Sequence, residues 1–478
     1  MMKTNKKFTQ GYIFKVLFLG ALLLVLLIPL SMIRALINER NAMALVAEAD
    51  IMEAWGSELV AVGPVLLVPG IRTTETRSVV QDVERVEIGR TSFSLVIVPQ
   101  QLDIQADFST EIRRRGIFSV PLFSGALAFS GTFNPAFALS SITPNEELFF
   151  DQAELVIALS NQKGIRRIDR AFWSSGGDEN RREMFFHPGS RGLDIVWVPT
   201  GMRGSRPMAG GIFAPLPDFT NSESAFDIVI SMQGGRMVRF LPIGQQTHVV
   251  ADSDWVSPSF QGSFLPARSE ITADGFDAVW DISYLSRDIP LFWRNEAGVQ
   301  QRNYTGSLFG VNFFRTIDTY SLNTRATRYA LLFLVVPFLA LFLLEVHTKK
   351  RIHLVQYLLS GIANIIFYLL LLSLSEQIYF HLAYIVAVIA VATLLTLYSR
   401  SLLPSWGKTF YFALAVLGSY ILLYVILNAE FFALLIGSIF AFVLVALVMF
   451  LTRNMDWYGI SFQNQGNPEN ELKDGEKI

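Results

Sequence analysis

The sequence predicts a membrane protein: an α-helical bundle of six transmembrane helices, one N-terminal and five C-terminal, with a large inserted β-rich, sandwich-like domain. The chain is 51% hydrophobic but only 17% charged. Several uncharged runs are long enough to cross the ~30 Å hydrocarbon core of a bilayer. Between the first run and the rest lie short Val-, Ile- and Phe-rich stretches separated by Gly, Pro, Asn and Asp, which is typical of strands.

Composition also excludes several classes of function. The 478 residues include no cysteine, which excludes disulfides, thiolate chemistry and cysteine-ligated metals. The formal net charge of −2 gives no reason to expect nucleic acid as a partner. The expected partners are the lipid bilayer and a component of the cell envelope, and the oligomeric state is not predicted.

The first apolar run begins at Val16, ends at Ile33 and follows several lysines. We interpret residues 13–33 as an uncleaved transmembrane anchor, with residues 1–12 in the cytoplasm. A cleaved signal peptide is the alternative, but its apolar region usually has about 7–15 residues. Residues 34–58 are rich in helix-forming residues and are expected to continue the helix outside the membrane, with a solvated stalk as the alternative.

Residues 59–328 are expected to form the β-rich domain on the periplasmic side. Stretches such as VERVEI and LDIQADF alternate apolar and polar residues, as strands with one wet face do. The spacing suggests antiparallel sandwiches or a partly open barrel. Residues 173–211, rich in Gly, Arg and Ser, are expected to be a long loop.

A short internal repeat favours two lobes, divided near residues 136–150. The pattern F-x-G-S/T-F-x-P-A occurs from Phe129 to Ala136 and again from Phe260 to Ala267. In each copy the aromatic residues alternate around a glycine, which indicates a bulge or a close backbone approach. Coincidence is the alternative explanation of one eight-residue match.

Residues 329–452 are expected to form the five-helix transmembrane block. The predicted spans are about Tyr329–Val346, Leu354–Ser375, Leu382–Ser399, Phe410–Leu427 and Phe431–Leu451. Lys and Arg occur in alternate connections only, on the same side as the N-terminal lysines. Positive residues mark the cytoplasmic side, so both termini are expected in the cytoplasm of a bacterial inner membrane protein and the large domain in the periplasm. The polar tail, residues 453–478, is expected to be a disordered cytoplasmic segment.

Motifs for catalysis, cofactors and metals are weak. The five histidines form no H-E-x-x-H motif. Ser160 and Lys163 fit S-x-x-K, but the partner motifs of penicillin-binding enzymes do not occur in the exported region. We therefore expect no catalytic residues, no cofactor and no metal site.

One membrane span carries a stripe of polar side chains. Its members recur every four residues, so they share one helix face: Gln356, Ser360, Asn364 and Tyr368. The stripe predicts hydrogen bonds between packed helices, with a ligand path as the alternative. No ionisable residue is expected at mid-span, because Glu345, Glu376 and Glu430 all lie near helix ends. An ion-coupled transporter usually needs such a group, so transport or lipid handling is the less favoured function.

The chain resembles the CreD family of bacterial inner-membrane proteins from Ile13 to Tyr458. The resemblance rests on motifs that occur in order: LLIPLSMIRALINER, VGPVLLVP, RRRGIF, GALAFSGTF, RFLPIGQQT, SDWVSPSFQGSFLP, ITADGFDAVWDI, FGVNFFRTIDTYSLNTRATRYALLF, FLLEV, HLVQYLLSGIANIIFYLLLLSLSE and LTRNMDWY. One departure is Asn428 to Phe431, where an acidic Glu-Asp pair is expected but Phe replaces Asp.

The resemblance implies a role in envelope integrity beside a two-component regulatory system, with altered tolerance of colicins and β-lactams. The family has no established catalytic activity, so no active-site residue carries over. We therefore expect a non-enzymatic protein whose periplasmic β domain binds an envelope component. An unrecognised envelope hydrolase is a further alternative.

Overall fold

The structure is a computed structural model that describes residues 5–80, 83–116, 118–176, 181–193, 195–199, 205–208, 210–217, 219, 222–296, 299, 302–313, 319–348, 352–429 and 432–453. The chain divides into two compact units. The helical unit comprises Met1–Ala44 and Ile317–Ile478, and the β domain comprises Leu45–Thr316. The cationic connection at residues 349–351, Glu430 and residues 454–478 lie outside the described residues.

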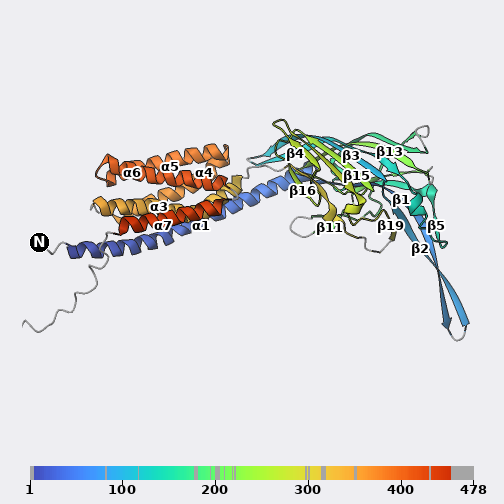
Figure 1. Ribbon diagram of the computed structural model, residues 1–478, viewed down its shortest axis with the longest axis horizontal. Helices are drawn as coiled ribbons and strands as arrows, with labels where there is room; N and C mark the ends of the chain where they lie inside the picture. Colours follow the sequence, from blue (N-terminus) through green and yellow to red (C-terminus); the bar gives the residue numbers. More distant parts are fainter. Residues whose placement is uncertain are drawn as a thin grey trace, which may run out of the picture. The chain divides into compact units, whose positions relative to one another are not determined.

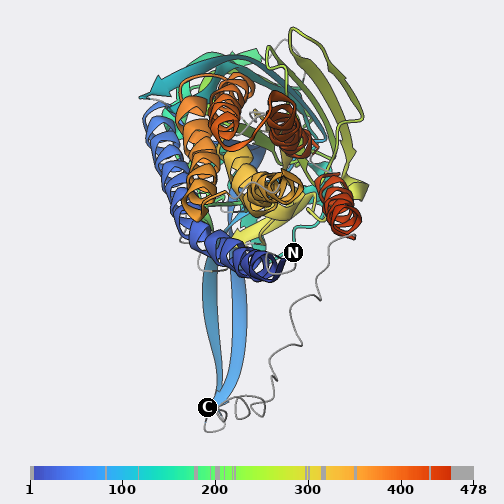
Figure 2. The same ribbon diagram turned by 90° about the vertical axis from the view of Figure 1, so that its left-hand side faces the viewer.

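The helical unit contains the six predicted membrane-spanning helices, except that residues 45–55 of the first one belong to the β domain. They are α1 (Asn5–Trp55), α3 (Thr319–Thr348), α4 (Leu354–Ser375), α5 (Phe380–Leu402), α6 (Trp406–Asn428) and α7 (Ala433–Thr452). Figure 2 shows the orange and red helices of this unit side by side, seen roughly along their axes. Helix α1 continues without interruption to Trp55, although it contains Pro29.

Helix α3 begins ten residues before the apolar span that the sequence predicted. It starts at Thr319, whereas the predicted span starts at Tyr329, so residues 319–328 are helical and were wrongly given to the β domain. This first part is polar, which is why hydropathy alone missed it. Its residues Ala326 and Thr327 are nevertheless buried, so packing against neighbouring helices stabilises the extension.

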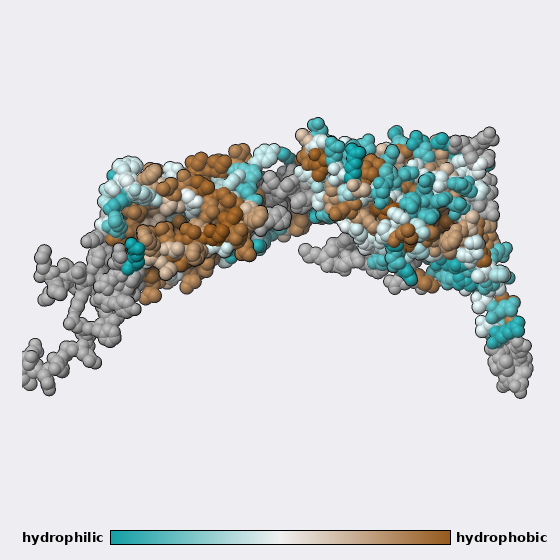
Figure 3. Space-filling view, viewed as in Figure 1, coloured by the Kyte–Doolittle hydropathy of each residue, from teal (hydrophilic) through white to brown (hydrophobic). Residues whose placement is uncertain are grey.

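Large apolar side chains cover the outside of the helical unit. The space-filling view shows a broad hydrophobic surface over these helices (Figure 3). Helix α7 has no buried residue among those described, and Phe440 on it stacks on Phe333 with ring centroids 5.6 Å apart. Exposed Trp406, Phe410 and Tyr411 gather at the start of α6, as aromatic residues do at membrane interfaces. A lipid environment explains this surface.

The described residues of the β domain form two large sheets and a small one (Figure 1). The ten-stranded sheet comprises β1 (Leu59–Val80), β2 (Val83–Ile97), β5 (Glu146–Leu148), β6 (Glu154–Leu159), β9 (His187–Pro188), β12 (Gly211–Pro215), β14 (Met237–Phe240), β16 (Ser259–Gly262), β19 (Phe292–Glu296) and β20 (Phe309–Asn312). The eight-stranded sheet comprises β3 (Gln101–Arg115), β4 (Phe118–Phe133), β7 (Ile165–Ser175), β8 (Arg181–Glu183), β13 (Ser224–Gly235), β15 (Gln246–Ser253), β17 (Arg268–Ile271) and β18 (Phe276–Ser283). Strands β10 (Trp197–Pro199) and β11 (Ser205–Pro207) pair with each other, and α2 (Ala136–Leu139) is one helical turn.

Both large sheets contribute to one hydrophobic core. Leu66 of β1, Phe129 of β4 and Trp280 of β18 belong to the same cluster of buried residues. Along β15 the inward residues Thr247 to Ser253 alternate with outward ones, the pattern of a strand with one buried face. The two-sheet, β-rich architecture is the one that the sequence predicted.

The predicted long loop at residues 173–211 is partly wrong. Strand β7 continues to Ser175, and β8, β9, β10 and β11 all begin within this range. These strands are only two or three residues long, which is below the length at which alternation is visible in a sequence. They form edges and a small separate ribbon.

The two copies of the sequence repeat have the same local role in different sheets. Gly131 on β4 has φ +153°, and a Cβ there would lie 2.0 Å from the Gln101 carbonyl oxygen. Gly262 on β16 has φ +108°, and its Cβ would lie 2.1 Å from the Leu308 carbonyl oxygen. The predicted close approach of backbone is therefore confirmed at both glycines. The two copies pair with unrelated strands, so they do not mark equivalent positions in two lobes.

Strands β1 and β2 form a long hairpin (Figure 1). Their register runs from Leu66 opposite Ile97 to Val80 opposite Val83. Beyond Arg72, strand β1 has no described partner strand other than β2. An isolated two-stranded ribbon is marginally stable in water, so the outer half of this hairpin depends on the inner half, which is paired within the sheet.

Candidate functional site

The polar stripe of α4 lies within the helical unit, and its member Asn364 bonds to neighbouring helices. Asn364 is only 1% exposed; its Nδ2 donates to the Phe333 carbonyl of α3 over 3.3 Å, and its Oδ1 accepts from the Tyr420 hydroxyl of α6 over 2.6 Å. The Ser360 hydroxyl donates to the Gln356 carbonyl, and Gln356 caps the helix by accepting from the His353 N–H. The Asn364 bonds favour the helix-packing interpretation, with a ligand path as the alternative.

Tyr368 completes the stripe but makes no hydrogen bond with the described residues. Its side chain is 1% exposed, and its hydroxyl has no partner among the described residues. Its ring packs edge-on against Phe367, with centroids 5.0 Å apart. The structure therefore places all four predicted residues on α4. Gln356, Ser360 and Asn364 have hydrogen-bond partners, whereas Tyr368 has none among the described residues.

A buried ion pair in the helical unit was missed by the sequence analysis. Lys15 Nζ of α1 lies 2.5 Å and 2.7 Å from the two carboxylate oxygens of Glu345 on α3, and 2.5 Å from the Ile352 carbonyl. The Tyr357 hydroxyl of α4 donates to the same carboxylate over 2.7 Å. Lys15 is 9% exposed and Glu345 only 1%. Charges at the ends of apolar runs are ordinary in a sequence, so nothing distinguished these two.

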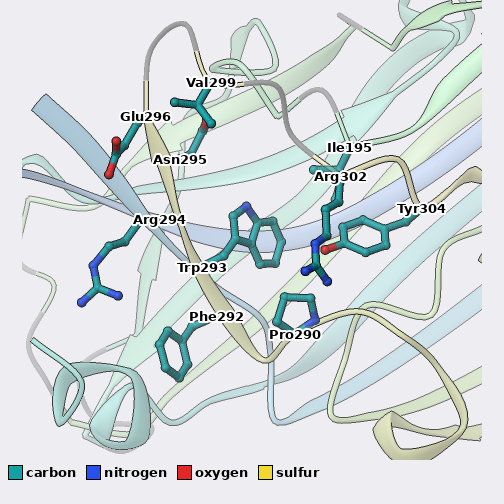
Figure 4. A pocket seen from close by; sticks show the side chains of 10 residues that line it. All are labelled: Ile195, Pro290, Phe292, Trp293, Arg294, Asn295, Glu296, Val299, Arg302 and Tyr304. Atoms are coloured by element: carbon teal, nitrogen blue, oxygen red, sulfur yellow. The ribbon is translucent and has the colours of Figure 1, made fainter.

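The β domain contains a cavity of about 380 Å³ beside β19, which we call the Trp293 pocket. Its walls mix aromatic, apolar and charged side chains: Ile195, Pro290, Phe292, Trp293, Arg294, Asn295, Glu296, Val299, Arg302 and Tyr304. Figure 4 shows the Trp293 indole pointing towards Tyr304 and Arg302, whereas Arg294 and Glu296 lie on the other side of the strand. The rings of Trp293 and Tyr304 have centroids 6.5 Å apart.

The strand alternation of β19 gives the two sides of the pocket different chemistry. Arg294 is held by Glu146, with Nη2 to Oε2 and Nε to Oε1 distances of 2.8 Å, and also donates to the Ser141 carbonyl. Glu296 lies 2.6 Å from Arg72. These charges are therefore neutralised within the domain. Arg302 is exposed and hydrogen-bonds to Tyr304, but it forms no ion pair with a described carboxylate. It is therefore the cation of the pocket whose charge is not neutralised by a described residue.

Buried polar groups fix the walls of the Trp293 pocket. The Arg287 guanidinium donates to the carbonyls of Ile243, Gly244 and Ile289, directly before Pro290. Burial lowers the pKa of Arg287 to about 10, so it stays charged at neutral pH. Burial raises the pKa of Tyr304, and the nearby Arg302 opposes this change only in part. The Tyr304 hydroxyl is therefore a neutral hydrogen-bonding group at neutral pH. The sequence contained no signal for this site, since its residues form no motif.

Comparison with known proteins identifies the family. The family described as inner membrane protein CreD matches residues 11–458. This chain belongs to the CreD family. The CreD inner membrane protein of Escherichia coli (strain K12) is 30% identical over 444 residues, which cover 92% of each chain. The resemblance that the motifs indicated is therefore confirmed.

A solved structure also shows similarity, at a level too low for inference. It is the crystal structure of a candidate protease from Parabacteroides distasonis, with 9% identity and a TM-score of 0.23. The alignment covers 67% of this chain and 59% of that protein. The score does not indicate a shared fold, so this similarity carries no argument about the activity of the CreD-family chain.

The S-x-x-K residues of this CreD-family protein are not arranged for nucleophilic catalysis. The Ser160 hydroxyl donates to the Glu58 carbonyl over 2.8 Å and accepts from the Val60 N–H over 2.7 Å. A nucleophilic serine needs a base within hydrogen-bonding reach, and no described bond joins Ser160 to Lys163. Ser160 is therefore a structural link between β1 and β6.

Acidic residues form a row across four strands of the eight-stranded sheet in this CreD-family domain. Asp252 of β15 is opposite Asp107 of β3 on one side and Asp277 of β18 on the other. Glu270 of β17 is opposite Asp277. Burial raises the pKa of Asp252, and repulsion from Asp107 and Asp277 raises it further by smaller amounts. Among the described residues no cluster has the arrangement of a metal site.

We predict that Asp252→Asn stabilises the β domain. Like charges directly opposite each other destabilise a sheet, so the substitution is expected to raise the free energy of unfolding by about 0.2–1 kcal/mol at neutral pH. A raised folded-state pKa means that the repulsion appears as pH rises through that pKa. The gain should therefore shrink in acid, as measured by denaturant unfolding of the full chain at several pH values. Asp274→Asn, outside the row, is the control and should change stability by less than about 0.5 kcal/mol; an equal gain there would contradict the prediction.

Proposed function

We propose that this CreD-family protein supports the integrity of the cell envelope without catalysing a reaction. In this proposal the β domain lies in the periplasm and binds an envelope component through the Trp293 pocket. The observation that carries it is one cavity that combines the Trp293 and Tyr304 rings with Arg302, a cation without a described counter-ion. Pockets with mostly apolar walls and a few placed polar groups are typical of ligand sites. The expected ligand has an apolar face for the indole and an anionic group for the guanidinium.

The distribution of cations supports the proposed orientation. Among the connections between the five C-terminal spans, Lys and Arg occur in alternate ones only, on the side that the N-terminal lysines share. Such residues mark the cytoplasmic side of a membrane protein, which supports the proposal that both termini lie in the cytoplasm. The alternative function, transport or lipid handling through the transmembrane block, gains no support from the stripe, because Asn364 is bonded to α3 and α6.

Charge reversal at Arg302 tests the proposed ligand site. Arg302→Glu should remove protection against envelope stress in a strain that lacks the native protein, because it places a carboxylate where an anionic group is proposed to bind. Loss of a charge-assisted hydrogen bond costs about 1.5–3 kcal/mol, or roughly tenfold to a hundredfold in affinity. Arg302 is exposed, so the fold should persist.

The matched control is Arg268→Glu, an exposed arginine on β17 outside the pocket. Survival is compared at equal protein levels. Full protection by the Arg302 variant would reject the pocket.

The orientation is tested separately with the variant Leu285→Cys. Leu285 is 80% exposed, and because the sequence contains no cysteine, the variant has a single thiol. A membrane-impermeant maleimide should label it in intact spheroplasts, and labelling only after lysis would reject the periplasmic placement.

A further inference from the structure

A second cavity, of about 180 Å³, lies between helices α1 and α3 within the helical unit. We call it the α1–α3 pocket; its lining residues are Arg34, Ile37, Asn38, Thr324, Thr327 and Arg328. On each helix the three lining residues are spaced i, i+3 and i+4, so each set forms one helix face. The walls therefore carry two guanidinium groups, one amide and two hydroxyls, and no carboxylate.

The two arginines lie at the same boundary of the apolar region. Arg34 directly follows Ile33, the last residue of the first apolar run, and Arg328 directly precedes Tyr329, where the apolar part of α3 begins. Long cationic side chains at such positions extend to the headgroup level of a bilayer. These cations are at the end of the spans opposite the lysine-rich side, so the positive-inside pattern does not account for them.

The charges of the α1–α3 pocket are not neutralised by the part of the protein that the structure describes. Arg34 Nη2 donates to the Thr327 carbonyl over 2.5 Å, which holds the guanidinium at the pocket but leaves its charge uncompensated. Neither Arg34 nor Arg328 forms an ion pair with a described carboxylate, whereas Arg40 on the same helix pairs with Glu376 over 3.9 Å. Thr327 is buried and its hydroxyl donates to the Thr324 carbonyl, which leaves its oxygen available as an acceptor only.

We propose that the α1–α3 pocket binds the phosphate group of an anionic phospholipid. A guanidinium presents paired N–H donors that match two phosphate oxygens, and it binds phosphate with strong charge-assisted hydrogen bonds. The Asn38 amide can donate a further bond to the headgroup. Lipid is the expected source of the phosphate, because Arg34 and Arg328 adjoin the ends of the apolar runs, the level at which headgroups lie. The site is independent of the Trp293 pocket and of the function proposed for it.

The test measures lipid binding to the full-length protein in a neutral detergent by native mass spectrometry. Arg328→Gln should weaken binding of dioctanoyl-phosphatidylglycerol by about tenfold or more, since a charge-assisted bond is lost. Binding of dioctanoyl-phosphatidylcholine, which has no net charge, should be weak in both proteins. Arg328 is exposed and makes no described hydrogen bond, so the fold should be retained, as thermal unfolding would check.

The matched control is Arg40→Gln, which removes the same charge from the same end of a span but outside the pocket. It should change affinity for phosphatidylglycerol by less than about threefold. Equal losses for the two variants would overturn the proposal, because general electrostatic attraction would then explain binding. Competition with glycerol 1-phosphate distinguishes the two sources of phosphate. If glycerol 1-phosphate at equal concentration fails to displace phosphatidylglycerol, the lipid site is supported. Full displacement would show a site for soluble phosphate esters and reject the lipid site.

Discussion

Glu345→Gln is expected to lower the free energy of unfolding of the helical unit by about 3–5 kcal/mol. The carboxylate contacts Lys15 at 2.5 Å and accepts from the Tyr357 hydroxyl, so it joins α1, α3 and α4. A glutamine retains the size of the side chain but removes its charge. Lys15, only 9% exposed, would then be a buried cation without a counter-ion, and the cost of desolvating it would no longer be offset.

The measurement is unfolding of the full-length protein by titration of sodium dodecyl sulfate into a neutral detergent. The double variant Lys15→Met with Glu345→Leu is the matched control, because it removes both charges and retains apolar volume. Replacing a whole buried ion pair with apolar residues is often neutral or stabilising, so the double variant should be more stable than Glu345→Gln. Equal destabilisation by both would show that local packing, and not the unpaired charge, determines the loss.

Glu146→Gln is expected to destabilise the β domain by a similar amount, about 3–5 kcal/mol. The Glu146 side chain is 2% exposed and lies between Arg294 of β19 and Arg72 of β1. The hydrogen bond from Arg294 is the largest of the effects that lower the Glu146 pKa from 4.5 to about 2. Without the carboxylate, two partly buried guanidinium groups would face each other with only Glu296 as a nearby acid.

The pH dependence provides the sharper measurement for Glu146. A depressed folded-state pKa contributes stability that is complete above the unfolded pKa and is lost as pH falls towards the folded pKa. Wild-type protein should therefore lose about 3 kcal/mol from this group between pH 4.5 and about 2, and the Glu146→Gln variant should not. Glu111→Gln is the control, because its pair with Arg113 is half exposed and is expected to contribute less than about 1 kcal/mol. Identical pH profiles for wild type and Glu146→Gln would contradict the assignment.

The helical and β-rich parts of the fold could be predicted because their signals are local. The length of an uncharged run decides whether a helix can span a bilayer. For the spans from Leu354 to Leu451, this length alone was enough to predict the helix. The alternation in LDIQADF likewise predicted the one-sided burial of β3. Prediction failed where the local signal was weak. Residues 319–328 are polar yet helical, and the short strands between residues 181 and 207 have too few residues to alternate.

The candidate sites depended on contacts between distant parts of the chain. Lys15 and Glu345 are separated by 330 positions, and each by itself resembles an ordinary interfacial charge. Arg72, Glu146 and Arg294 meet only because β1 pairs with β5 and lies next to β2, which in turn pairs with β19. The Trp293 pocket similarly joins Ile195 to residues 290–304.

The sequence by itself therefore determined the membrane class, the six helices, the β-rich insertion and the family. Only the tertiary structure decided which charges are buried and paired and which arginines, Arg302, Arg34 and Arg328, are left without a described counter-ion. The physical reason is that hydrophobic length and periodicity are properties of consecutive residues. The energy of a charge depends instead on burial and on neighbours that strand register and helix packing bring together.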